Sequence, residues 1–157
     1  MSEDPHHGRF VVVPASYVFL LREDGADTEV LLQLRQNTGY MDDHWAAAAA
    51  GHVEQGETAY DAARREALEE IGVSDLDLSF VTAMQRTRHD LPIDERIDFF
   101  FTARSWSGEP RIVEAAKAAE LRWCRLDALP DPVVPHERFV LESLRAGTTS
   151  SYCTFGF

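Results

Sequence analysis

The sequence predicts an α/β fold, in which strands form a mixed sheet and two helices pack against it. Residues 10–21 are rich in Val, Phe and Tyr, and residues 96–106 contain three consecutive Phe, compositions typical of strands. Residues 59–71 and 136–145 instead contain helix formers, and each segment is followed by a glycine, the usual residue at a helix end. Strands interrupted by two helices indicate the α/β class.

The remaining elements follow from local patterns. Residues 29–34 predict a strand that forms a hairpin with the first one, through a turn at residues 23–25. Residues 76–88 and 121–126 predict two further strands, and residues 115–119 predict a helical turn. With 157 residues, one domain is expected. We place it at residues 10–147, between a flexible N-terminal tail at residues 1–9 and a C-terminal tail at residues 148–157 whose aromatic residues pack on the domain or on a partner chain.

The charge of the chain restricts its partners. Asp and Glu number 27 against 15 Lys and Arg, which gives a formal net charge of −12. Such a balance argues against a nucleic-acid polymer and against an anionic membrane surface, whereas a small anionic substrate remains compatible if divalent cations intervene. No apolar stretch has the length of a membrane span, and two cysteines without metal-type spacing fit a reduced, cytoplasmic setting.

The helix at residues 59–71 carries the strongest functional signal. Thr58 is a suitable N-cap residue, with Asp61 three positions later, as in a capping box. At about 100° per residue, one side of the helix contains its large apolar side chains, and we take this side as the core face. The predicted core face comprises Tyr60, Ala67, Leu68 and Ile71, and the opposite side carries Glu66, Glu69 and Glu70 beside Ala59, Ala62 and Ala63. A solvated acidic face is the alternative interpretation of the three glutamates.

The spacing around these glutamates resembles the Nudix box. Gly51 is followed after five residues by Glu57, and after seven more by the run Arg-Glu-Ala-Leu-Glu-Glu-Ile-Gly-Val at residues 65–73. Every fixed position of the box is present, and Ala67 at an aliphatic position is the one soft departure. The resemblance extends over roughly residues 10–145 and implies an α/β/α sandwich around a mixed β-sheet. It also implies that the alanine run at residues 46–50 is a short buried strand, although alanine favours helices.

The resemblance implies a hydrolase that splits the diphosphate of a nucleoside diphosphate derivative. Glu66, Glu69 and Glu70, with the carbonyl oxygen of Gly51, would bind Mg²⁺, or Mn²⁺ in its place, because hard cations prefer oxygen ligands. We expect catalytic roles for these glutamates and also for Arg65 and Glu57, which either tie the box loop to the helix or orient Glu69. The general base is left open among Glu69 and Glu70 of the box and the later acids Asp90, Asp94, Glu95, Asp98, Glu114 and Glu120.

Substrate contacts are expected outside the box. Arg35, Arg86, Arg88 and Lys117 are candidates for phosphate binding, with surface ion pairing as the alternative role of each. Tyr40 and Trp45 are candidates for stacking on a base, with core packing as the alternative. The histidines lack ligand spacing, so we assign His52, His89 and His136 no metal.

Two other function classes compete with hydrolysis. A catalytically silent Nudix-fold module that binds or senses nucleotides would usually lack box glutamates, and this chain has all of them. An isoprenoid diphosphate isomerase of the same fold would need metal ligands that are absent at matching positions. We expect a monomer or a homodimer that takes a small anionic nucleotide-type substrate.

Overall fold

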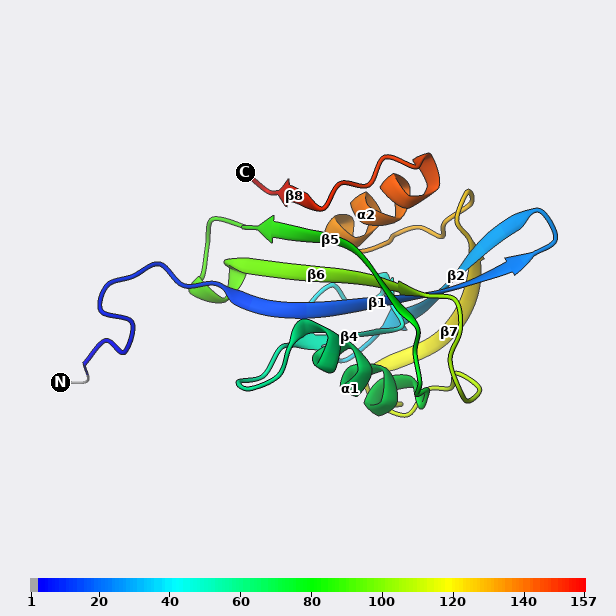
Figure 1. The fold of residues 1–157 in the computed structure, drawn as a ribbon, viewed down its shortest axis with the longest axis horizontal. Coiled ribbons are helices and arrows are strands. Elements are labelled where there is room, and N and C mark those ends of the chain that lie inside the picture. Colours follow the sequence, from blue (N-terminus) through cyan, green and yellow to red (C-terminus); the bar gives the residue numbers. More distant parts are fainter. Residues whose placement is uncertain (1–2) are drawn as a thin grey trace.

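The computed structural model describes residues 3–157, and its centre is a mixed sheet between two helices (Figure 1). The strands lie in the order β3-β2-β1-β6-β5-β8, with β4 beside β1 and β7 beside β2. The β1–β6 and β5–β8 pairs are parallel and the other pairs antiparallel, so the predicted fold class is confirmed. The elements are β1 Val13–Asp24, β2 Asp27–Arg35, β3 Trp45–Ala47, β4 Ala49–His52, α1 Ala59–Ile71, β5 Leu78–Arg86, a 3₁₀ turn Pro92–Asp94, β6 Arg96–Ala103, β7 Ala118–Arg125, α2 Pro135–Ala146 and β8 Tyr152–Phe155.

The alternation of side chains along β1 produces two cores, one on each face of the sheet. Val18 and Leu20 belong to the cluster that includes Ala63, Ala67 and Ile71 of α1. Tyr17, Phe19 and Leu21 belong to the cluster that includes Val140 and Leu141 of α2. Because successive residues of a strand point to opposite faces, this single strand supports both helices.

The core face predicted for α1 is partly wrong. Its buried residues are Ala62, Ala63, Ala67 and Ile71, whereas Tyr60 is 43% exposed and Leu68 is 56% exposed. The helix packs on Ala48 and Ala49, and small side chains on both partners allow a close approach that a Leu or Tyr would prevent. The face of α1 that packs on the sheet is therefore made mainly of alanines.

The ends of α1 agree with the sequence. The side chain of Thr58 accepts a hydrogen bond from the Asp61 N–H, and the Asp61 carboxylate accepts one from the Thr58 N–H, so the capping box is complete. Gly72 ends the helix at a φ of 70°, a left-handed conformation that favours glycine.

The alanine run forms strands, as predicted. Residues 45–47 pair with β2 and residues 49–52 pair with β1, and Ala46, Ala47, Ala48 and Ala49 are all buried. Backbone pairing with two neighbouring strands overrides the helical propensity of alanine at this position. The helical turn predicted at residues 115–119 is partly wrong, because residues 115–117 form a turn that is not helical and β7 begins at Ala118.

Both terminal segments contain local structure. Residues 1 and 2 of the predicted N-terminal tail lie outside the described residues, and residues 5–8 form an exposed turn. The predicted C-terminal tail includes β8, which adds a parallel edge strand beside β5. Within residues 3–157, no helix has the length and apolar character needed to cross a membrane.

Candidate active site

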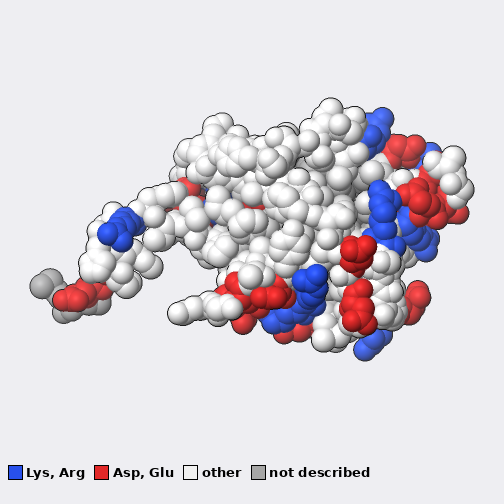
Figure 2. Space-filling model, in the orientation of Figure 1, with Lys and Arg blue, Asp and Glu red and all other residues white. Residues whose placement is uncertain are grey.

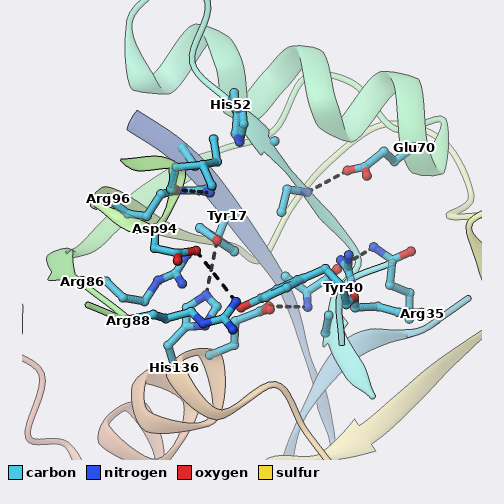
Figure 3. A pocket seen from close by; sticks show the side chains of 18 of the residues that line it. Tyr17, Arg35, Tyr40, His52, Glu70, Arg86, Arg88, Asp94, Arg96 and His136 are labelled. Carbon is cyan, nitrogen blue, oxygen red and sulfur yellow. Dashed lines mark hydrogen bonds and ion pairs between the residues drawn. The ribbon is translucent and has the colours of Figure 1, made fainter. Parts of the chain in front are cut away.

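A cavity of about 480 Å³ opens between the end of β4 and the start of α2 (Figure 3). Four of the residues predicted to contact substrate line this cavity, namely Arg35, Tyr40, Arg86 and Arg88. Glu70 and Gly51 of the box line it as well. The fold thus brings the predicted substrate contacts and part of the predicted metal site to one concave surface.

Two of the box glutamates lie against consecutive residues of β4. Glu70 Oε2 accepts a hydrogen bond from the Ala50 N–H at 2.6 Å. A β-carbon added at Gly51 would overlap the carboxylate of Glu66. The glycine of the box is therefore required because the Glu66 carboxylate occupies the space of a side chain there.

Close packing of these carboxylates makes their charged forms unfavourable. Burial raises the pKa of Glu70 to about 8, with smaller contributions from the charges of Glu66 and Glu114. Burial also raises the pKa of Glu66, although the hydrogen bond from Arg65 opposes this shift. Among the later acids considered as a base, Glu114 acts electrostatically on both of these carboxylates. A cation bound nearby would stabilise the charged forms of these two carboxylates.

Arg65 connects the box loop to α1. Its guanidinium lies 2.7 Å from Glu57 and 2.7 Å from Glu66, and it also donates to the carbonyl oxygen of His52 at 3.1 Å. The predicted Glu57–Arg65 pair is thus present, and hydrogen bonding from Arg65 lowers the pKa of Glu57. Glu69 lies 3.3 Å from the same guanidinium. One guanidinium thus reaches three carboxylates, those of Glu57, Glu66 and Glu69.

The donor set fits a hard divalent cation, although the side chains are not gathered around a point. Among residues 3–157, no three His, Cys, Asp or Glu side chains stand close enough together to hold a metal ion. Glu66 and Glu70 nevertheless present carboxylates beside neighbouring residues of one strand, and burial raises the pKa of both groups. Glu66, Glu69 and Glu70 are the residues that would hold the ion.

Arginine side chains dominate the wall of the cavity opposite α1. Arg86 donates from Nε to Asp98 at 2.8 Å, and Arg88 lies 3.8 Å from Asp94. Arg35 donates to the Tyr40 carbonyl oxygen at 2.9 Å, and its guanidinium lies 5.6 Å from the centre of the Tyr40 ring. The Arg88 guanidinium lies 5.8 Å from the same ring. Anion-binding groups therefore surround the aromatic side chain.

Two predicted contacts lie elsewhere. Lys117 is absent from the cavity lining among the described residues, and its side chain is exposed, 3.8 Å from Glu114. Trp45 is buried in the core, with Arg122 stacked on its ring at 4.5 Å. Trp45 therefore has the packing role that we considered as the alternative.

Sequence reasoning missed the polar floor of the cavity. Glu137 is 3% exposed, its Oε1 accepts a hydrogen bond from the Ala47 N–H at 2.7 Å, and burial raises its pKa to about 7. His136 Nε2 lies 3.2 Å from the Tyr17 hydroxyl. One signal could have found Glu137, because it precedes Val140 and Leu141 at helical spacing and so shares the core face of α2.

Comparison with known proteins defines the class of this fold and site. The family model described as NUDIX domain matches residues 12–144. The chain therefore belongs to the NUDIX domain family. It is a Nudix hydrolase, an enzyme that acts on phosphoric anhydride bonds.

Solved structures support the same assignment. A MutT NUDIX hydrolase from Burkholderia pseudomallei is 25% identical over 82% of this chain and 96% of its own, with a TM-score of 0.66. A Nudix hydrolase from M. smegmatis, RenU, is also 25% identical, over 86% of this chain and 84% of its own, with a TM-score of 0.62. The NUDIX domain of Shewanella oneidensis NrtR in complex with ADP ribose has a TM-score of 0.71 over 92% of this chain and 93% of its own, and at 16% identity it shares the fold. No curated protein matches the chain in sequence.

Proposed function

We propose that this chain is a divalent-metal-dependent pyrophosphohydrolase that cleaves the diphosphate of a nucleoside diphosphate derivative, of nucleotide or nucleotide-sugar type. The observation that carries the proposal is one cavity that joins Glu70 and Gly51 of the box to four arginines and Tyr40. Carboxylates at one end suit a cation, and arginines at the other suit phosphate oxygens. Two free cysteines agree with a cytoplasmic enzyme, and we expect it to act as a monomer or a homodimer.

The arrangement assigns a chemical task to each part of the site. When bound at Glu66, Glu69 and Glu70, Mg²⁺ or Mn²⁺ supplies charge that lowers the repulsion between a diphosphate and an attacking water. Arg65 holds Glu66 and Glu57 in place, and Arg35 and Arg88 orient the diphosphate beside Tyr40. Among the later acids, Asp94 lines the cavity and Glu114 adds negative charge near Glu66 and Glu70, so both stay candidates for the general base.

Removal of divalent metal is expected to abolish the activity. A panel of nucleoside diphosphate derivatives, including nucleotide sugars and nucleoside triphosphates, is assayed for release of phosphate or nucleoside monophosphate in Mg²⁺, in Mn²⁺ and in EDTA. We expect hydrolysis of at least one compound that stops in EDTA and returns with either ion. Full hydrolysis in EDTA would contradict the metal-dependent mechanism, and no hydrolysis of any compound would contradict the proposed function.

Tyr40→Ala tests whether Tyr40 stacks on the base. Tyr40 lies in the polar segment between β2 and β3 and lines the cavity between Arg35 and Arg88. Loss of stacking on a base removes about 1–3 kcal/mol, so we expect KM to rise about tenfold or more. The kcat value should change little, because the base does not change during the reaction and stacking on it stabilises substrate and transition state equally.

Steady-state kinetics on the best substrate of the panel decide this prediction. Tyr60→Ala is a matched control, because Tyr60 is a half-exposed tyrosine on α1 and is absent from the cavity lining among the described residues. An unchanged KM in Tyr40→Ala would mean that Tyr40 has only a packing role.

A further inference from the structure

The C-terminal strand is attached to the segment that forms one wall of the cavity. Strand β8 runs parallel to β5, with Phe155 opposite Arg86, the last residue of β5. The hydrogen bonding continues one residue further, because the Thr87 N–H donates to the Phe155 carbonyl oxygen at 3.1 Å. Thr87 begins the segment at residues 87–95, which we call the wall segment. Arg88, Leu91 and Asp94 of this segment line the cavity.

The residue after β8 fits the wall segment too closely for a side chain. Gly156 has a φ of 90°, and a β-carbon there would overlap the carbonyl oxygen of Thr87. Phe157 then places its ring edge-on to the ring of His89, with the ring centres 6.2 Å apart. Backbone and side chain at residues 156–157 therefore both contact the first turn of the wall segment.

The same strand also contacts the floor of the cavity. The Phe155 ring lies edge-on to His136, with centres 6.3 Å apart, and is similarly placed against Phe139 at 6.1 Å. His136 lines the cavity and reaches the Tyr17 hydroxyl. The ring of Phe155 thus contacts α2, and its carbonyl oxygen accepts the hydrogen bond from Thr87 of the wall segment.

The pairing of β5 with β6 holds the two ends of the wall segment, and residues 88–93 between them are exposed. His89 has a positive φ of 55°, which is uncommon for a residue with a side chain, and Leu91 is 57% exposed. The ties within the segment include hydrogen bonds from Thr87 to Glu95 at 2.7 Å and from the Leu91 N–H to Asp94 at 2.9 Å. Figure 2 shows that the surface over β5 and β8 carries few charged side chains.

We propose that Phe155, Gly156 and Phe157 are positioning residues for substrate binding, because they set the place of the wall segment and hence of Arg88. This inference rests on the proposed function only for the KM measurement. The effect on the wall segment is measured by amide hydrogen exchange, which needs no substrate. It predicts that a disturbance at residues 156–157 weakens substrate binding, although neither residue lines the cavity among the described residues.

Gly156→Ala is the main test. The added methyl group overlaps the Thr87 carbonyl oxygen, so the wall segment must shift. We expect KM to rise about fivefold or more with kcat within twofold, and amide hydrogen exchange in residues 88–94 to become at least several times faster in the substrate-free protein. Phe157→Ala should change both quantities in the same direction and by less, because its side chain is 68% exposed.

Two controls separate the proposed role from general effects. Gly25→Ala places the same methyl group at a φ of 63° in the β1–β2 turn, where nothing lies within 4 Å. Tyr152→Ala removes an exposed aromatic ring from the start of β8, where its hydroxyl donates to Gln85. Both controls should leave KM and the exchange of residues 88–94 unchanged.

The two readouts distinguish failure of this inference from failure of the proposed function. If Gly156→Ala leaves hydrogen exchange at residues 88–94 and KM as in the wild type, the inference is wrong. If no compound of the panel is hydrolysed, the exchange measurement and the dissociation constant of Mg²⁺–ADP still test it. A Gly156→Ala protein whose Tm falls no further than that of Gly25→Ala, and whose segment exchanges faster, supports the inference.

Discussion

Glu70→Gln is expected to lower turnover at least about a hundredfold and at the same time to stabilise the metal-free fold. The activity falls because an amide is a poor ligand for a hard cation, and losing even about 3 kcal/mol of the stabilisation that the ion supplies costs about two orders of magnitude in rate. The fold is retained because a glutamine oxygen still accepts the hydrogen bond that Glu70 takes from the Ala50 N–H.

The gain in stability depends on pH in a defined direction. The pKa of Glu70 is about 8 in the folded protein, against an ordinary value of 4.5, because burial disfavours the charge. A carboxyl group with a raised folded pKa binds its proton more tightly in the folded state, so the wild type loses stability as pH rises from about 4.5 to about 8. Glutamine does not titrate, so the variant gains up to about 4 kcal/mol over the wild type at pH 8 and almost nothing below pH 4.5.

Denaturant unfolding of both proteins in EDTA, from pH 4 to pH 8, measures this difference. Glu109→Gln is the control, because Glu109 is exposed and this substitution removes one negative charge outside the site. Added Mg²⁺ should raise the Tm of the wild type and change that of Glu70→Gln little, because the ion binds a carboxylate. A marked loss of stability in Glu70→Gln at pH 8 would contradict this account and would make Glu70 a structural residue.

Gly51→Ala should lower activity about as much as Glu70→Gln does, for a steric reason. The new β-carbon would overlap the Glu66 carboxylate, which must then swing away from β4. The displaced group is the end of a flexible side chain, so we expect the fold to survive, with kcat/KM reduced about a hundredfold or more and with weaker Mg²⁺ binding by calorimetry.

Two companion variants make this test specific. Gly56→Ala lies in the loop after β4, at a φ of 89°, and nothing lies within 4 Å of the added carbon, so this variant should bind Mg²⁺ normally. Glu66→Asp combined with Gly51→Ala shortens the displaced side chain and should recover part of the Mg²⁺ affinity lost in Gly51→Ala. Normal Mg²⁺ binding and full activity in Gly51→Ala would contradict this account.

The fold class and the box were predictable from sequence because they depend on local patterns. Alternating β-branched and aromatic residues indicated the long strands, and Thr58, Asp61 and Gly72 marked the ends of α1. The spacing from Gly51 to Val73 identified the family. These signals lie within short stretches of chain, where residue type and spacing carry the information.

The tertiary structure decided how α1 faces the sheet. The hydrophobic pattern favoured burial of Tyr60 and Leu68, but Ala62 and Ala63 are buried instead, because the partner strand is built of alanines. That close approach is what buries Glu70 and raises its pKa. Helical periodicity alone could not show this, since it describes one helix and contains no information on the size of the side chains opposite.

The sequence by itself determined the family and the acidic helix, because residue types and spacing were sufficient. Four of the six candidate substrate contacts line the cavity. Only the tertiary structure showed that Lys117 lies outside the cavity and that Glu137 lies in its floor. It also placed residues 155–157 against the wall segment, although they are more than 60 positions from it in sequence. The physical reason is that strand pairing between distant segments sets these contacts, and the position of a residue along the chain does not record which strand becomes its neighbour.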